Sequence, residues 1–147
     1  MIYSPQMNSM LFGTAGIPLS TPGSSTIDGI YHIKTLGLDA LEIEFVRNVY
    51  LTRESATNVG AAAREAGIRL SAHAPYYLNL NAAEPEKLAK SRSFLFKAAQ
   101  IASFAGAGNV VFHPGYYLKN TSEEAFATIL ENISKVEQQL SEEGLST

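Results

Sequence analysis

The feature that most constrains the fold of this chain is a fourfold alternation of short apolar runs and longer segments with helical periodicity. Strand-length apolar runs begin near Met10, Ala40, Ile68 and Asn109, and the segments that follow them carry apolar residues at helical offsets. Four strand-then-helix units with short returns predict parallel strands, because antiparallel neighbours need only tight hairpins whereas parallel neighbours need crossovers. The sequence therefore predicts an α/β fold.

Capping signals mark the ends of the predicted helices. The first is predicted over residues 24–36, and the second follows Thr52, which can cap it. The third begins at Glu84-Pro85, with proline suited to the first turn, and Thr121 and Glu124 have the spacing of a capping box for the fourth. The predicted helices end at four glycines that can form left-handed C-caps: Gly37, Gly67, Gly106 and Gly144. The fourth helix carries an apolar stripe: Phe126, Ile129, Leu130, Ile133, Val136 and Leu140.

The length of the repeat predicts a larger architecture. Units of roughly 33 residues would need about 265 residues for eight copies, which is the size of a (β/α)8 barrel. The 147 residues hold four units, so we expect residues 1–147 to be one domain that forms the N-terminal half of a TIM barrel. The final Gly144-Leu145-Ser146-Thr147 repeats the glycine-then-apolar step that precedes strands, which we interpret as truncation. The alternative is a complete, open, four-stranded sheet with a frayed terminus.

Composition excludes several classes of protein. Hydrophobic residues make up 46% of the chain, enough for a core, and the lack of cysteine excludes disulfides, thiol catalysis and Cys-based metal sites. The formal net charge of -3 means that any contact with a polyanion must be local. No apolar run approaches the roughly 18 residues of a membrane span, and residues 1–16 lack the pattern of a secretory signal. We therefore expect a cytoplasmic protein with no membrane partner.

Polar and aromatic residues gather where the predicted strands end, which is where reacting groups collect in parallel α/β folds. The first strand runs into Gly13-Thr14-Ala15-Gly16, which lacks the full glycine pattern of a phosphate-binding loop and is interpreted as a turn. The second strand runs into Arg47-Asn48. The third and fourth run into His-Ala-Pro-Tyr-Tyr at 73–77 and His-Pro-Gly-Tyr-Tyr at 113–117. The sequence thus predicts a candidate site at the C-terminal edge of the sheet.

Two of the three histidines share this edge. If the third and fourth strands are neighbours, about 4.8 Å apart, His73 and His113 at equivalent depths could reach one metal ion. The alternative is that each histidine ends its strand and hydrogen-bonds a loop backbone. Their matched positions favour a metal. His32, opposite the apolar face of the first predicted helix, is expected on the solvated surface.

Two glutamates are further candidates. Glu42 and Glu44 alternate with apolar residues, so both carboxylates point to the same side of the second strand. They could serve inside a barrel as ligands or bases, or they could face water in an incomplete sheet. Glu44, nearer the C-terminal edge, is the better candidate for a catalytic group.

Aromatic and cationic residues at the same edge are suited to nucleotides or sugars. The pairs Tyr76-Tyr77 and Tyr116-Tyr117 offer planar faces, and Arg47 offers a positive charge. The alternative is structural, and we expect at least one tyrosine of each pair to pack against the following helix.

Three segments resemble the archaeal type of endonuclease IV. They are Glu-Phe-Val-Arg-Asn at 44–48, Leu-Ser-Ala-His-Ala-Pro-Tyr-Tyr-Leu-Asn-Leu-Asn at 70–81, and Val-Val-Phe-His-Pro-Gly-Tyr-Tyr at 110–117. The likeness runs the length of the chain. It implies a zinc-dependent, xylose-isomerase-like (β/α)8 barrel that hydrolyses DNA 5′ to abasic sites in base excision repair, and only its N-terminal half lies in this sequence.

The resemblance also implies roles for individual residues. The family histidines that match His73 and His113 bind one zinc of a three-zinc cluster. The other ligands would follow Thr147, so residues 1–147 can supply at most one partial site and cannot build the cluster. The implied partner is double-stranded DNA with abasic sites, held by loops that enter the minor groove. The residues assigned to this DNA-binding edge are Arg47, Asn48, Tyr76, Tyr77, Leu78 and Tyr116.

Two other functions remain open. A metal-dependent sugar isomerase or epimerase of the same barrel superfamily would use Glu44 and one metal near His73 on a small substrate. A non-catalytic half-barrel would self-associate through its exposed strand edges. The tyrosine-rich edge favours DNA over both.

Overall fold

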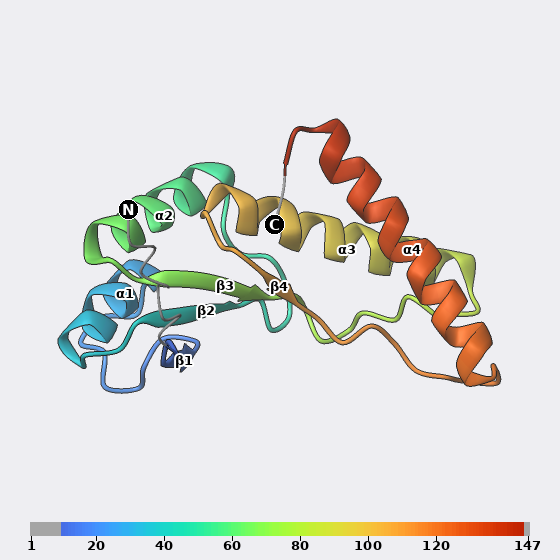
Figure 1. Cartoon of the computed structure of the whole chain (residues 1–147), viewed down its shortest axis with the longest axis horizontal. Helices are drawn as coiled ribbons and strands as arrows, with labels where there is room; N and C mark the ends of the chain where they lie inside the picture. Colours follow the sequence, from blue (N-terminus) through green and yellow to red (C-terminus); the bar gives the residue numbers. More distant parts are fainter. Residues whose placement is uncertain (1–9, 146–147) are drawn as a thin grey trace, which may run out of the picture.

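A four-stranded parallel sheet and four alternating helices form the fold in a computed structural model that describes residues 10–145 (Figure 1). The order is β1 (Gly13–Ala15), α1 (Thr26–Thr35), β2 (Ala40–Glu44), α2 (Arg53–Ala66), β3 (Arg69–His73), α3 (Pro85–Phe104), β4 (Val110–Val111) and α4 (Ser122–Glu142). The strands lie in chain order, and each pairs in parallel with the next. The α/β fold and the partial TIM-barrel architecture are confirmed. Residues 1–9, which make up most of the segment expected to lack a secretory signal, lie outside the described residues, as do Ser146 and Thr147 of the C-terminal step.

Local capping explains where the helices begin. Thr52 and Thr121 cap α2 and α4 as predicted, each accepting a hydrogen bond from a backbone N–H of the first turn. Helix α1 begins at Thr26, later than predicted, because the side chain of Ser25 forms a capping box with Asp28. Gly67 ends α2 in the left-handed conformation, with φ of 71°. Of the helices within residues 10–145, none has the length and apolar character to cross a membrane.

The two faces of the sheet differ in burial. Helices α1, α2 and α3 cover one face, where Leu41 and Ile43 of β2 and Ala72 of β3 are each at most 1% exposed (Figure 1). The other face carries the half-buried Glu42 and Glu44. Alternation along each strand places these two sets on opposite sides. In a closed barrel, the second face would line the interior.

Two details differ from the sequence-based expectations. The first strand is predicted near Met10, but β1 begins at Gly13. The apolar stripe of α4 is only partly covered: Val136 and Leu140 are buried, whereas Phe126 and Leu130 are 67% and 51% exposed. The reason is that α4 packs mainly on α3, and a single neighbour cannot cover a wide stripe.

Candidate metal and nucleic-acid site

The strand register brings the candidate residues to one edge of the sheet. Glu44 of β2 lies opposite His73 of β3, and His73 lies opposite Val111 of β4. His113 therefore lies two residues beyond the position opposite His73, about 6.6 Å further along an extended chain. Because β4 ends at Val111, His113 lies in the loop that follows it. His113 is therefore still at the C-terminal edge of the sheet, as expected, whereas the expectation of equivalent depths is wrong.

The hydrogen bond of His73 leaves one of its ring nitrogens available. Its Nδ1 lies 2.8 Å from the backbone oxygen of Ala74. A carbonyl oxygen can only accept, so Nδ1 donates, and in the neutral ring Nε2 keeps its lone pair. This contact is the hydrogen bond to a loop backbone that the structural alternative predicts. Many metal-binding histidines also donate one ring N–H to a carbonyl oxygen, which orients the ring so that its other nitrogen can bind the metal.

His113 has a buried nitrogen that lacks a partner. Its Nε2 is buried and makes no hydrogen bond among the described residues. Leaving a buried polar atom unsatisfied costs about 1 to 3 kcal/mol, and a bound cation would remove this cost. The available nitrogens of His73 and His113 thus fit the zinc that the resemblance implies. No group of three or more His, Cys, Asp or Glu side chains within residues 10–145 could hold a metal ion, so a tetrahedral site would be incomplete here.

Each histidine contacts a tyrosine three residues later. The ring centroids lie 4.8 Å apart for His73 and Tyr76 and 4.7 Å apart for His113 and Tyr116. The hydroxyl of Tyr76 donates to Oε2 of Glu44 at 3.0 Å. This hydrogen bond, with the negative charge of the carboxylate, raises the pKa of Tyr76 above its usual value. The Glu44 carboxylate therefore links the second strand to the tyrosine beside His73.

The expected DNA-binding residues divide into an exposed group and one core residue. Five of the six expected residues have exposed side chains: Arg47, Asn48, Tyr76, Tyr77 and Tyr116; Tyr117, which follows them, is exposed as well. All four tyrosines are at least 48% exposed, so none of them is buried against the helix that follows it. Leu78 is 1% exposed and belongs to the hydrophobic core, so its assignment to the DNA-binding edge is corrected to a packing role.

Sequence reasoning missed an asparagine that joins the two histidine-bearing loops. Asn81 is 4% exposed, and its Nδ2 donates to the backbone oxygens of Tyr116 and Tyr117 at 2.8 and 3.2 Å. Its Oδ1 accepts from Nδ2 of Asn120 at 3.2 Å. The available signal was the alternation of asparagine and leucine at 78–81, which places polar side chains inside an apolar run.

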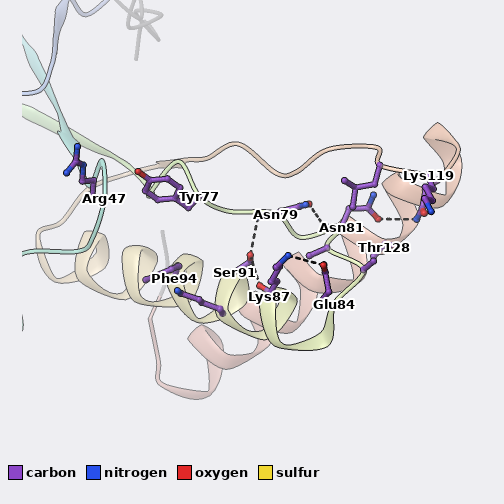
Figure 2. Close-up of a pocket in the computed structure, with 15 residues that line it drawn as sticks. Arg47, Tyr77, Asn79, Asn81, Glu84, Lys87, Ser91, Phe94, Lys119 and Thr128 are labelled. Carbon is purple, nitrogen blue, oxygen red and sulfur yellow. Dashed lines mark hydrogen bonds and ion pairs between the residues drawn. The ribbon is translucent and has the colours of Figure 1, made fainter.

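A groove of about 900 Å³ lies beside this edge (Figure 2). The loop after β3, the first half of α3 and the connection from β4 to α4 form its walls. Arg47 and Tyr77 line it, whereas the two histidines are not among its lining residues. The candidate metal ligands and the groove are therefore neighbouring but distinct features.

Comparisons with known sequences find a family model and relatives that match most or part of this chain. A family model described as a xylose isomerase-like TIM barrel matches residues 30–146. An uncharacterized protein of Methanocaldococcus jannaschii is 39% identical over 127 residues, which cover 86% of this chain and 45% of the relative. A probable endonuclease 4 of Mycoplasma genitalium is 35% identical over 67 residues, or 46% of this chain and 23% of the relative. The chain spans less than half the length of these relatives.

Solved structures share the fold. Endonuclease IV of Thermus thermophilus superposes with a TM-score of 0.62 and 25% identity, covering 83% of this chain and 46% of that one. A putative xylose isomerase of Rhodospirillum rubrum superposes with a TM-score of 0.70 and 14% identity, covering 94% of this chain and 52% of that one. The second likeness concerns the fold alone.

Proposed function

The chain belongs to the xylose isomerase-like TIM barrel family, and we propose that it is the zinc-binding, DNA-contacting half of an endonuclease IV of the archaeal type. Such an enzyme would cut DNA 5′ to abasic sites. The observation that carries the proposal is the pair of imidazole nitrogens available for a metal, on His73 and His113. The 25% identity with an endonuclease IV structure supports it.

Each residue of the site has a role that its contacts permit. A zinc ion held by His73 and His113 would act as a Lewis acid on a phosphate oxygen and would lower the pKa of a bound water. The carbonyl of Ala74 fixes which nitrogen of His73 is available. Glu44 holds the hydroxyl of Tyr76, so the exposed ring keeps its place beside His73. Because two nitrogens leave zinc under-coordinated, residues 1–147 should bind it weakly.

The DNA-binding edge would hold the duplex around the lesion. Arg47 and Asn48 are exposed after β2, and Tyr76, Tyr77 and Tyr116 present rings after β3 and β4. A guanidinium can pair with phosphate, and aromatic rings can stack on bases or occupy the space left by a missing one. This combination favours a damaged duplex over a small sugar.

Zinc titration tests the metal half of the proposal. Against a competing chromophoric chelator, we expect His73→Ala and His113→Ala each to lower zinc affinity about tenfold or more, because each removes one of two ligands. His32→Ala is the matched control, since His32 lies on α1 and its Nε2 contacts Ser20. Unchanged affinity in both site variants would refute the shared site.

Binding and cleavage of DNA test the DNA-binding part of the proposal. The protein should bind a duplex that carries a tetrahydrofuran abasic-site analogue more tightly than the same duplex without it. If the protein is active, zinc should increase the yield of a nick on the 5′ side of the analogue, seen by gel electrophoresis. Equal binding to both duplexes would contradict lesion recognition.

A metal-dependent sugar isomerase or epimerase is the second candidate. Glu42 and Glu44 share the open face of the sheet with His73, which is suited to proton transfer on a small substrate. The likeness to a putative xylose isomerase is consistent with this reading at the level of fold. Zinc-dependent interconversion of ketohexoses that is lost in Glu44→Gln, without cleavage of abasic DNA, would select it.

A further inference from the structure

The groove beside the DNA-binding edge has a shape that suits an extended ligand. Its volume of about 900 Å³ lies in the range of ligand-binding clefts. In Figure 2, Arg47 lies at one end, Lys119 at the other, and Lys87 between them. These side chains come from the loop after β2, from the connection before α4 and from α3. The cations are therefore spread along the groove rather than gathered around one point.

The charge of the groove is opposite to that of the chain. The chain carries a formal net charge of -3, whereas the groove is lined by four of the eleven Lys and Arg side chains and by a single carboxylate, Glu84. Such a local excess of positive charge attracts anions at short range even on an acidic protein. The cationic lining residues are Arg47, Lys87, Lys90 and Lys119.

The contacts of the lysines leave them able to bind an anion. Lys87 pairs with Glu84 at 2.9 Å, but the two side chains are 71% and 59% exposed. Ion pairs that are this exposed contribute little to the free energy of folding. The ammonium of Lys90 lies 5.5 Å from the ring centroid of Phe94, which keeps it at the groove wall without neutralising its charge. A phosphate can therefore compete with Glu84 for Lys87 and with the ring of Phe94 for Lys90.

We propose that this groove binds the phosphodiester backbone of a DNA strand next to the abasic site, with Lys87, Lys90 and Lys119 contacting successive phosphates. The inference rests on the proposed function, because it extends the same DNA interface away from the metal site. A row of cations fits a polyanion, whereas a small phosphorylated ligand needs donors that converge on one point. Arg47 and Tyr77 belong to both the groove and the DNA-binding edge, so one strand can follow both.

The salt dependence of DNA binding tests the proposal. Fluorescence anisotropy with a labelled duplex, undamaged or carrying a tetrahydrofuran site, would be measured at several salt concentrations for Lys90→Gln and Lys119→Gln. Each lost phosphate contact should reduce the slope of log K against log salt by about 0.9, which corresponds to about eightfold in affinity at 0.1 M salt. Both duplexes should weaken equally, because backbone contacts carry no lesion information.

Lys97→Gln is the matched control. Lys97 is exposed on α3, the helix that also carries Lys90, but it does not line the groove, so its loss should leave the slope unchanged. Unchanged slopes in Lys90→Gln and Lys119→Gln, with preference for the abasic duplex retained, would overturn the groove proposal and keep the proposed function.

The other outcomes also separate the two proposals. Reduced slopes with equal affinity for the two duplexes would support the groove as a DNA site and refute lesion recognition. Unchanged slopes in Lys90→Gln and Lys119→Gln, together with binding of inorganic phosphate at low millimolar concentration that both variants lose, would assign the groove to a small phosphorylated ligand and overturn the backbone proposal. No binding to either duplex would refute both.

Discussion

Asn81 connects the loop that follows His73 with the loop that follows His113, and its removal should loosen both. The side chain is 4% exposed and makes three hydrogen bonds across these loops. It donates to the backbone oxygens of Tyr116 and Tyr117 and accepts from Asn120. These contacts span 35 to 39 residues of sequence, so they fix one loop against the other.

The cost of Asn81→Ala follows from these bonds. Each net hydrogen bond contributes about 0.5 to 1.5 kcal/mol. Tyr116 and Tyr117 lie at the protein surface, so we take the middle of this range as the cost of each lost bond. Loss of all three should lower the free energy of unfolding by about 3 kcal/mol. For a chain of this length, that corresponds to a fall in Tm of about 6 to 12 °C.

Urea denaturation followed by circular dichroism measures this loss. Asn81→Asp should be at least as unstable as Asn81→Ala, because a carboxylate cannot donate to the two backbone oxygens and places a negative charge beside them. Asn58→Ala is the control: Asn58 is exposed on α2, and alanine favours a helix, so stability should stay within about 0.5 kcal/mol of wild type.

Two results would refute this reasoning. A loss below about 1 kcal/mol in Asn81→Ala would mean that the three bonds contribute little beyond what water replaces. Wild-type stability in Asn81→Asp would mean that the donor side of the amide is irrelevant. A loose arrangement of the loops should also weaken zinc binding, because His73 and His113 would no longer be held in a fixed relation.

Three further changes have defined outcomes. Gly60→Ala should lower the free energy of unfolding by about 1 to 3 kcal/mol, because the added Cβ would lie 2.5 Å from a backbone oxygen at the end of α3, whereas Gly108→Ala meets open space and should not. Thr121→Ala removes the cap of α4 and should cost about 1 kcal/mol by thermal denaturation. Glu44→Ala removes the hydrogen bond and charge that raise the pKa of Tyr76, so this pKa, measured by ¹³C NMR of the ring, should fall; an unchanged value would contradict the contact.

The elements that the sequence predicts well are those with local causes. Thr52 and Thr121 cap helices because their side chains bond to residues three positions away, which is visible in the sequence. Parallel pairing follows from the length of each crossover. These two kinds of signal were enough for the fold class, since neither depends on which residues meet across the core.

The site was predicted less completely because its geometry depends on packing between distant segments. The register that sets His113 two residues beyond the level of His73 results from how β3 and β4 meet, and strand patterns alone do not fix it. Leu78 is part of a motif that resembles a DNA-binding loop, but its apolar side chain turns into the core. The bonds of Asn81 join loops that no local pattern relates.

The open face of the sheet and the outer side of α4 leave apolar side chains uncovered. Glu42 and Glu44 satisfy part of their hydrogen bonding through Ser71 and Tyr76, so this face tolerates water as it stands. Val111 of β4 is 46% exposed, and the apolar stripe of α4 is only partly covered. Exposing these apolar side chains to water is unfavourable. A second copy that pairs its first strand with β4 would cover both and complete a ring of eight parallel strands. Sedimentation velocity should then show a concentration-dependent dimer of residues 1–147, whereas a folded monomer at all concentrations would rule out this pairing.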